Sequence, residues 1–375
     1  MTVYANAKIV LESEVVEGHM AVADGRIAAI DHGPAKGEDF GGDYIVPGLV
    51  ELHTDHLEVH VAPRPGVRWD VTAAIQAHDA QIAASGITTV LDALRVGLDT
   101  DGSLTSKDSR EIADAILASQ AEGRLRAEHR FHLRCEVSDE HAIPGYNLFE
   151  GLSAVDLISL MDHTPGQRQF QTMDSYKLYF QTKKGMTDEE FDHFQRTRRS
   201  RAAIWSDRNR RELAERAKAR GTVIASHDDA TEDHVAEAVR DGVTLAEFPT
   251  TFKAADASRA AGMMVLMGGP NMVRGSSHSG NVSAADLADR DSLDILSSDY
   301  VPFSLLQGAF ALADRPRWGL PRAIATVTRA PARAVGLTDR GVLEAGARAD
   351  FVRVRRPEGG VPVVCGVWRE GQRVA

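Results

Sequence analysis

Val46-Pro-Gly-Leu-Val-Glu-Leu-His-Thr-Asp-His56 is the stretch of this sequence that decides its fold. It begins as an apolar run typical of a buried strand and ends in side chains that bind metal ions. His53 and Asp55 lie two residues apart, and side chains two apart on a strand point to the same face. One strand end therefore offers an imidazole and a carboxylate to a single ion. The C-terminal end of a barrel strand is the usual place for such a site.

Length and composition limit the kinds of protein this chain can be. Its 375 residues suit a (β/α)8 barrel with a small accessory unit. We find no run of about 18 apolar residues and no secretory signal pattern, so neither a membrane span nor export is expected. Only two cysteines occur, Cys135 and Cys365, which argues against a disulfide scaffold and favours the cytoplasm. The net charge of −11 disfavours non-specific nucleic-acid binding but does not exclude an anionic small substrate.

The two ends of the chain have a similar pattern of short strands and turns. Glu17-Gly18 and Asp24-Gly25 are hairpin signals between the first three strands. Strands at both termini around a different middle predict one small β-sandwich domain, built from residues 1–45 and 338–375. The predicted strands are Lys8–Leu11, Gly18–Val22, Arg26–Ile30, Asp350–Val354, Val361–Trp368 and Gly371–Ala375.

The middle of the chain alternates apolar runs with helical stretches, which is typical of a parallel α/β fold. One clear helix is Val71–Ala84, followed by Gly86 as a C-terminal cap. Eight strands predict a closed TIM barrel over residues 46–337, with an exposed helical insertion around 164–220. The eight strands are Ile45–Asp55, Thr88–Ala93, Phe131–Glu136, Leu157–His163, Thr222–His227, Leu245–Phe248, Met263–Met267 and Leu293–Asp299.

Several of these strands end in acidic or imidazole side chains. A single histidine at a strand end is usually a structural residue, and an isolated His-x-Asp is usually a solvated loop. Six such groups at the ends of five strands are hard to explain in that way, because burying each of them unpaired costs free energy. They therefore predict a divalent-metal site. The candidate ligands are His53, Asp55, Glu136, His163, His227 and Asp299.

The same residues allow roles to be assigned. A bridging Glu136 would permit two ions, which can activate a water between them. Asp299 is the expected general base, because a carboxylate at the edge of the site can take the proton of that water. The expected cofactor is one or two divalent ions. Zinc is the first choice, and manganese, iron or magnesium are alternatives, because carboxylate ligands favour harder ions.

Longer blocks of the sequence resemble a known family. Together with the strand endings and the divided β domain, they resemble the amidohydrolase superfamily and, within it, the triphosphate diphosphatases of the carbon–phosphorus lyase pathway. The resemblance covers nearly the whole chain. Its main blocks are Glu51-Leu-His-Thr-Asp-His-Leu-Glu58, Ala127-Glu-His-Arg130, His132-Leu-Arg-Cys-Glu136, Ser159-Leu-Met-Asp-His-Thr-Pro-Gly-Gln-Arg-Gln-Phe170, Ala225-Ser-His-Asp-Asp-Ala-Thr231, Ala246-Glu-Phe-Pro-Thr-Thr251 and Asp294-Ile-Leu-Ser-Ser-Asp-Tyr300.

This resemblance implies an activity in phosphonate catabolism. The family hydrolyses α-D-ribose 1-methylphosphonate 5-triphosphate to the 5-phosphate and diphosphate. The chain departs from the wider superfamily at Asp55, where a second histidine is usual. It also lacks a lysine that could be carboxylated to bridge two metals, so Glu136 is expected in that role.

Phosphoanhydride hydrolysis needs positive charge on the phosphate oxygens. The Gly- and Ser-rich segment 268–281 after the seventh strand is a candidate phosphate-binding loop. Three further residues are expected to orient the metal-binding imidazoles. The candidate phosphate-binding residues are Arg64, Arg134, Arg168, Arg274 and His278, and the candidate orienting residues are His56, Asp228 and Asp229.

Two other functions fit part of the sequence. A cyclic amidase or deaminase would use the same fold on a C–N bond, but it would not need several arginines and a Gly/Ser-rich loop around the metals. A non-catalytic barrel would be expected to have lost metal ligands, and all six candidates are present. The expected partner is a small triphosphate, with no nucleic acid and no membrane, and a homo-oligomer is possible on this sequence.

Overall fold

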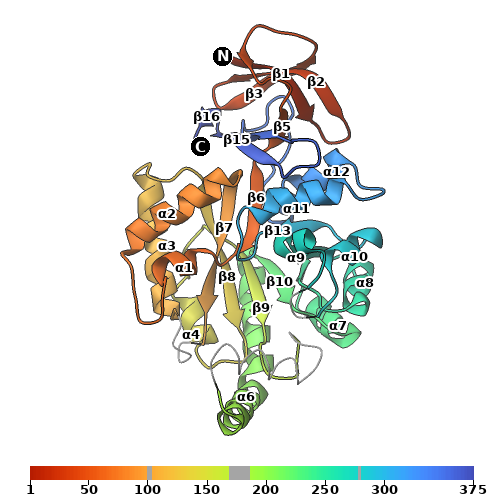
Figure 1. Cartoon of the computed structure of the whole chain (residues 1–375). Helices are drawn as coiled ribbons and strands as arrows, with labels where there is room; N and C mark the ends of the chain where they lie inside the picture. Colours follow the sequence, from red (N-terminus) through yellow and green to blue (C-terminus); the bar gives the residue numbers. More distant parts are fainter. Residues whose placement is uncertain (99–103, 169–185, 278–279) are drawn as a thin grey trace.

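The computed structural model of the chain describes residues 1–98, 104–168, 186–277 and 280–375 (Figure 1). Its strands form two sheets of eight strands each. One sheet is the predicted parallel barrel, and the other is built from both termini. In Figure 1 the terminal sheet lies above the barrel, and the N- and C-termini lie close to each other in it.

The barrel strands are hydrogen-bonded in sequence order, each parallel to its neighbour. Seven of the eight predicted strands are confirmed with changes of a few residues at their ends, and the first is confirmed only from Leu49. Their bounds are β6 (Leu49–Thr54), β7 (Ile87–Val96), β8 (Glu128–Glu136), β9 (Val155–Met161), β10 (Val223–His227), β11 (Leu245–Glu247), β12 (Met264–Gly268) and β13 (Ile295–Ser297).

The barrel is brought together where β13 meets β6. The N–H of Asp299 donates to the His53 carbonyl oxygen at 3.0 Å, and Thr54 pairs with Asp299 in a parallel bridge. The buried Glu51 carboxylate crosses the same junction and accepts the N–H groups of His53, at 2.6 Å, and of Ser298, at 2.5 Å. These bonds fix the end of the last strand beside the end of the first.

Successive side chains of β6 point alternately to the two faces of the barrel sheet, and the apolar ones belong to two different clusters. Val50 and Leu52 belong to an apolar cluster contributed by other barrel strands, including Leu157 and Leu245. Leu49 belongs to a different cluster, shared with helices of the outer layer. Side chains of opposite parity thus serve the two faces of the sheet.

Helices follow most barrel strands. The predicted helix Val71–Ala84 is confirmed: the Asp70 side chain accepts the N–H of Ala73 at 2.8 Å, and Gly86 has a φ of 91°. The described helices are α1 (Leu57–Val61), α2 (Val71–Ala84), α3 (Ser106–Ala121), α4 (Ala142–Asn147), α6 (Asp188–Arg220), α7 (Glu232–Arg240), α8 (Phe252–Ala260), α9 (Gly269–Arg274), α10 (Ala284–Asp289), α11 (Ser304–Ala313), α12 (Leu320–Ala325) and α13 (Arg329–Ala334).

The long helix α6 accounts for the described part of the predicted insertion. Thr187 and Glu190 form a reciprocal capping box at its start, and Gly221 ends it in the left-handed conformation. It lies at the end of the barrel opposite the terminal sheet (Figure 1). Residues 169–185 of the insertion lie outside the described part. None of the described helices combines the length and apolar character needed to cross a membrane.

The terminal sheet has the order β16-β15-β14-β5-β1-β2-β3, with β4 also paired to β1. A β unit from both termini is confirmed, but its strands form one continuous sheet that curves around a shared core. Tyr4, Phe40, Phe351 and Trp368 meet in that core, with ring centroids 4.7–5.6 Å apart. The bounds are β1 (Thr2–Val10), β2 (Val15–Ala23), β3 (Arg26–His32), β4 (Glu38–Asp39), β5 (Tyr44–Pro47), β14 (Phe351–Arg355), β15 (Val363–Arg369) and β16 (Gln372–Arg373).

Two local predictions about strands were wrong. Glu17-Gly18 is not a turn: the first hairpin turns where the N–H of Leu11 donates to the Glu14 carbonyl oxygen, and Gly18 lies inside β2. A Cβ atom on Gly18 would lie 1.9 Å from the Asp31 carbonyl oxygen, so this glycine permits a close approach between strands. The predicted strand Ile45–Asp55 is in fact two strands, β5 and β6, which belong to different sheets and are separated at Gly48.

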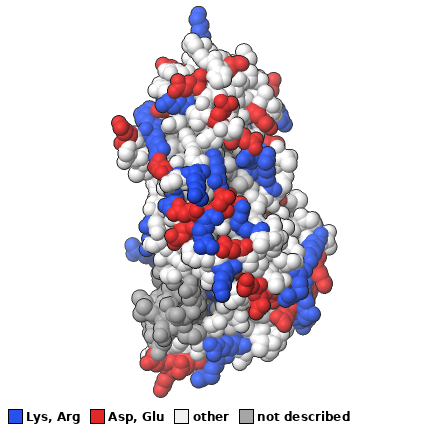
Figure 2. Space-filling model, turned by 90° about the vertical axis from the view of Figure 1, so that its right-hand side faces the viewer, with Lys and Arg blue, Asp and Glu red and all other residues white. Residues whose placement is uncertain are grey.

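Charges of both signs are mixed on the face shown in Figure 2, where Lys and Arg lie among Asp and Glu. Neighbouring charges of opposite sign on the outer helices form ion pairs, such as Arg290 with Asp256 at 2.9 Å. This surface is not the single-sign basic area typical of nucleic-acid binding.

Candidate active site

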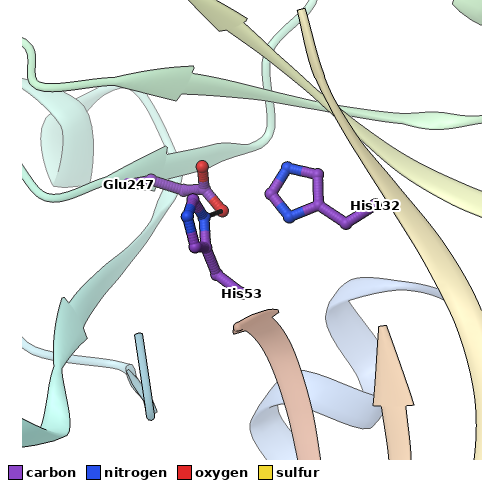
Figure 3. Close-up of side chains that lie close together, drawn as sticks. All are labelled: His53, His132 and Glu247. Atoms are coloured by element: carbon purple, nitrogen blue, oxygen red, sulfur yellow. Dashed lines mark hydrogen bonds and ion pairs between the residues drawn. The ribbon is translucent and has the colours of Figure 1, made fainter. Parts of the chain in front are cut away.

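Three buried side chains meet at the centre of the site (Figure 3). His53 comes from the end of β6, His132 from β8 and Glu247 from the end of β11. A nitrogen or oxygen of each lies within 4.8 Å of the others. Parallel strands bring their carboxyl ends to one rim of a barrel, which explains why residues so distant in sequence come together.

Glu247 is the most highly connected of the three. Its Oε1 accepts from His53 Nδ1 at 3.2 Å, and its Oε2 accepts from Ser159 Oγ at 2.5 Å and from His227 Nδ1 at 3.4 Å. Burial opposes ionisation, but the electrostatic interaction with His53 and the hydrogen bonds from His227 and His53 hold the pKa of Glu247 well below its usual range. The carboxylate is thus an anion inside the barrel, surrounded by imidazoles.

His132 already has protein partners on both ring nitrogens. Its Nδ1 donates to the Leu52 carbonyl oxygen at 2.9 Å, and its Nε2 contacts Ser159 Oγ. Burial lowers the pKa of His132 to about 3, so the ring is neutral. It therefore supports the site from below rather than presenting a free nitrogen to it.

A second group of possible metal ligands lies beside the first. It contains His163, His227 and Asp228, whose ligand atoms also lie within 4.8 Å of one another. The His227 ring stands between the others, with its centroid 5.6 Å from that of His53 and 5.5 Å from that of His163. Three of the predicted imidazole ligands therefore form one row.

Glu136 holds His163 as Glu247 holds the other two histidines. Its Oε2 accepts from His163 Nδ1 at 2.6 Å, and its Oε1 accepts the backbone N–H of His163 at 3.0 Å. Despite burial, the His163 charge and hydrogen bond lower the pKa of Glu136 to about 2. The hydroxyl of Ser138 also donates to this carboxylate.

Asp55, Asp299 and Arg134 form the charged side of the site. Arg134 Nη1 donates to Asp55 Oδ2 at 3.1 Å. Burial, followed by the charge of Asp55, raises the pKa of Asp299 to about 7. Two carboxylates that repel each other in a buried site are stabilised by a nearby cation.

The backbone is bent in the same way at three of these strand ends. Asp228, Phe248 and Asp299 follow β10, β11 and β13, and their φ angles are 57°, 53° and 53°. Each donates its N–H to a strand beside it, for example Asp228 to the Glu247 carbonyl oxygen at 2.9 Å. The left-handed region is unusual for a bulky residue such as Phe248, and such conformations concentrate at functional sites.

Other predicted residues lie further out. The buried Arg168 forms ion pairs with Asp229 and Glu237. Asp229 therefore binds a guanidinium rather than an imidazole. Its partner Arg168 lines a cavity of about 670 Å³ between the segment after β9 and helices α6 and α7.

Within the described part of the chain, His56, Arg64 and Arg274 lie away from the imidazole row. His56 contacts the Tyr300 carbonyl oxygen through Nδ1 at 3.1 Å and Gln81 Oε1 through Nε2 at 2.9 Å. Arg64 lies exposed in a turn, and Arg274 is exposed at the end of α9. The segment proposed as a phosphate loop contains this helix rather than an uninterrupted loop, and His278 lies outside the described residues.

Our reading of the sequence missed the importance of Glu247 and His132. Glu247 ends an apolar strand just as His227 does, so the strand-end rule would have found it had it been applied to the sixth barrel strand. His132 lies two positions before Arg134 and four before Glu136 on one face of β8, and this alternation is the signal that could have found it. Nothing in the sequence showed that one carboxylate would contact histidines from two other strands.

The barrel and its strand-end site define the class of protein. The chain belongs to the amidohydrolase family, whose family model matches residues 163–375. A curated relative from Escherichia coli (strain K12), the alpha-D-ribose 1-methylphosphonate 5-triphosphate diphosphatase, is 47% identical over 374 residues, which is 98% of this chain and 99% of the relative.

Solved structures of other amidohydrolases share the fold. The N-acetylglucosamine-6-phosphate deacetylase of Thermotoga maritima has a TM-score of 0.63 at 12% identity, over 100% of this chain and 99% of its own. The dihydropyrimidinase of Brevibacillus agri NCHU1002 has a TM-score of 0.61 at 12% identity, over 99% and 94% of the two chains. At such low identity these similarities establish the fold alone.

The donor chemistry of the site fits a divalent ion. Three histidines use Nδ1 to contact carboxylates, so each keeps Nε2 for another ligand. Several carboxylates converge on the same rim, and burial of such anions is unfavourable without a cation. This combination of imidazole nitrogen and carboxylate oxygen is typical of zinc and of harder divalent ions.

Proposed function

We propose that the chain hydrolyses α-D-ribose 1-methylphosphonate 5-triphosphate to α-D-ribose 1-methylphosphonate 5-phosphate and diphosphate, as a step of phosphonate catabolism. The observation that carries this proposal is the 47% identity, over 98% of the chain, to a protein with that activity. The site supports it, because the buried imidazoles and carboxylates lie beside a guanidinium rather than in an apolar pocket.

His53, His163, His227 and Asp299 would hold the metal, with Asp55 and Glu136 as further carboxylate ligands if two ions bind. Zinc is the expected ion, and manganese, iron or magnesium are alternatives. The bound ion would supply positive charge at the scissile phosphate and would acidify the attacking water. The closeness of the three imidazole rings supports this assignment.

Asp299 would accept the proton of the water that attacks phosphorus. Asp299 is partly buried just after β13, and backbone bonds to His53 and Asp55 fix the segment that carries its carboxylate. A positioned carboxylate of this kind typically accelerates proton transfer by about 10²–10⁴-fold. The proton would then leave toward solvent as diphosphate departs.

Arg134 would neutralise charge on the triphosphate. Its side chain is largely buried beside Asp55, and its Nε donor has no hydrogen-bond partner within the described part of the chain. A phosphate oxygen would satisfy that donor, and guanidinium binds phosphate well. Arg64, Arg168, Arg274 and His278 remain candidates for the outer phosphates, with Arg168 already paired to carboxylates.

Phosphorus NMR of the triphosphate with metal-loaded protein tests this function. Wild-type protein is expected to release diphosphate, and Asp299→Asn is expected to lose at least about 10²-fold in rate. Orthophosphate would show cleavage at the terminal phosphorus and overturn the assigned bond. A lack of turnover with metal bound, together with hydrolysis of cyclic amides, would overturn the proposed reaction in favour of C–N chemistry.

We further infer a cytoplasmic enzyme that acts on a small molecule, and a homo-oligomer is possible. Cys135 and Cys365 are both free thiols, as a reducing compartment favours. Size-exclusion chromatography with light scattering tests the assembly, and a monomeric mass at micromolar concentration would contradict it.

A further inference from the structure

One carboxylate contacts two histidines that come from different strands. Glu247, at the end of β11, accepts hydrogen bonds from two histidines. Nδ1 of His53, in β6, lies 3.2 Å from its carboxylate, and Nδ1 of His227, in β10, lies 3.4 Å from it. The two rings are nearly parallel, with an angle of 19° between their planes. Both rings therefore turn the edge that carries Nδ1 toward the Glu247 carboxylate.

This arrangement decides where each ring carries its hydrogen. A carboxylate accepts hydrogen bonds, so the nitrogen that contacts it must be the donor. Nδ1 of His53 and Nδ1 of His227 are thus both protonated. In a neutral ring the other nitrogen, Nε2, then has its lone pair available.

The rest of the surroundings argue that Glu247 is not itself a ligand. Its Oε2 also accepts from Ser159 Oγ at 2.5 Å, so both oxygens already have protein partners. Glu247 is only 1% exposed, so its carboxylate is enclosed by these protein partners. His132 completes its surroundings through Ser159 rather than by offering a free nitrogen.

We propose that Glu247 is a positioning residue that fixes His53 and His227 together in the Nδ1–H tautomer, so that both present Nε2 to one metal ion. This rests on the proposed metal-binding role of the two histidines, but it does not depend on the reaction or the substrate. Sharing one carboxylate couples the two ligands, because neither ring can turn without losing a bond to the same anion. Residues that orient metal ligands in this way typically change metal affinity by 10–100-fold when replaced.

The test reads tautomers directly in the metal-free protein. Long-range proton–nitrogen NMR of ¹⁵N-histidine-labelled wild-type protein is expected to show His53 and His227 as Nδ1–H tautomers, assigned by single His→Gln variants. Glu247→Gln keeps the size of the side chain but offers only one acceptor oxygen. It is expected to release at least one of the two rings into a mixed or Nε2–H state.

Ser159→Ala is the matched control, because it removes a third partner of Glu247 and leaves both Nδ1 contacts. It is expected to keep both tautomers. Zinc affinity, measured by chelator competition, is expected to fall roughly 10–100-fold in Glu247→Gln and much less in Ser159→Ala.

Three results would overturn the proposal. They are an Nε2–H tautomer of either ring in metal-free wild-type protein, an unchanged zinc affinity in Glu247→Gln, and an X-ray absorption spectrum of zinc-loaded wild-type protein that requires Glu247 as an oxygen ligand. The wild-type measurements need no variant, so a folding defect does not block the test. They also need no substrate, so failure of the proposed reaction would leave the outcome readable.

Discussion

At the residue scale, the site is built from histidines whose Nδ1 atoms are held by carboxylates. Glu247 takes this position for His53 and His227, and Glu136 takes it for His163. A histidine held at one nitrogen has a defined direction for the other, which is what an ion needs from a ligand. Glu136 therefore has a structural use even before any bridging role is considered.

Arg134 provides a residue-scale prediction. Arg134→Gln removes the guanidinium beside Asp55 and the unpaired Nε donor, so charge on the triphosphate is no longer neutralised. We expect kcat/KM for triphosphate hydrolysis to fall by about 10²-fold or more, because charge-assisted bonds to phosphate are strong. This change in kcat/KM is measured from the rate of diphosphate release under steady-state conditions.

The control for this change is Arg290→Gln, which removes a partly exposed arginine paired with Asp256 on an outer helix. It is expected to leave kcat/KM within about twofold, as surface substitutions usually have small effects. Equal losses in both variants, or full activity of Arg134→Gln, would contradict the assignment.

At the scale of elements, one glycine connects the two sheets. β5 ends at Pro47 in the terminal sheet, and β6 starts at Leu49 in the barrel, so only Gly48 lies between them. Its N–H donates to the Asp350 carbonyl oxygen at 2.8 Å. The crossing leaves no room for a side chain, because a Cβ atom there would lie 2.2 Å from Thr88 Oγ1.

Gly48→Ala is therefore expected to destabilise the protein by about 1–3 kcal/mol, the usual effect of overpacking. In a Thr88→Ala background the cost should be smaller, because the atoms that the new Cβ would meet at 2.2 and 2.8 Å are both removed. Urea unfolding of the single and double variants measures the difference. Gly308→Ala, whose added Cβ would meet nothing closer than 3.4 Å, is the control and should stay close to wild type. An equal cost in both backgrounds would exclude the steric explanation.

A buried network joins α2 to the strands β7 and β8. His129 Nδ1 contacts Asp92 at 2.7 Å, and its Nε2 contacts Asp79 at 3.4 Å. His78 contacts the other oxygen of Asp92 at 2.9 Å. Burial alone would lower the pKa of His129, but the neighbouring carboxylates of Asp92 and Asp79 raise this pKa to about 9.

This network predicts a pH dependence of stability. The pKa of His129 in the folded protein lies above its value of 6.5 in the unfolded chain. Its contribution to the free energy of unfolding is therefore complete below pH 6.5 and is lost as the pH rises toward 9. The loss is on the order of 3 kcal/mol. Urea unfolding of metal-free wild type and His129→Gln across this range should give free energies that converge at high pH.

The exposed His193 offers a matched substitution, His193→Gln, which should follow the wild-type pH profile. A constant gap between wild type and His129→Gln from pH 6.5 to 9 would contradict a charged His129. At acid pH a different loss is expected, because the same ion pairs hold the pKa of Asp92 below its usual range against the effect of burial. That contribution disappears as the pH falls below the ordinary aspartate value.

At the scale of the whole molecule, the barrel and the terminal sheet are joined by an ion cluster. Glu128, at the start of β8, accepts from Arg340 at 2.7 Å and from Arg348 at 2.5 Å. Against the effect of burial, these arginines lower the pKa of Glu128 to about 2. Both arginines lie in the segment that leads into β14, so one barrel residue anchors the return of the chain to its first sheet.

Glu128→Gln is expected to lower the free energy of unfolding by about 2 kcal/mol, between the values for exposed and buried ion pairs. The wild-type contribution is present above pH 4.5 and is lost as the pH falls toward 2, since the folded pKa is the lower one. Amide exchange should quicken in the segment that contains Arg340 and Arg348. Glu122→Gln, which removes a more exposed partner of Arg124, is the comparison. Equal exchange in both variants would contradict a joining role.

Most of the fold could be predicted from the sequence because barrel strands are short apolar runs with polar ends. The break at Gly48 could not, because the run from Ile45 to Val50 has no polar side chain while the chain passes from one sheet to another. The predicted ligands were found by strand-end position. The role of Glu247 depends on which side chains of the other strands it meets inside the barrel, and the positions of the strands in the sequence do not give these contacts.

The curved terminal sheet has a consequence for how the protein is made. Its central strand β5 lies between β1, which is translated before every barrel strand, and β14, which is translated after all of them. Until Phe351 and Trp368 arrive, Tyr4 and Phe40 lack the aromatic partners that cover them in the finished molecule. The nascent chain must therefore carry an open strand edge and an uncovered apolar face while the whole barrel is synthesised, and such unpaired edges and apolar surfaces favour aggregation.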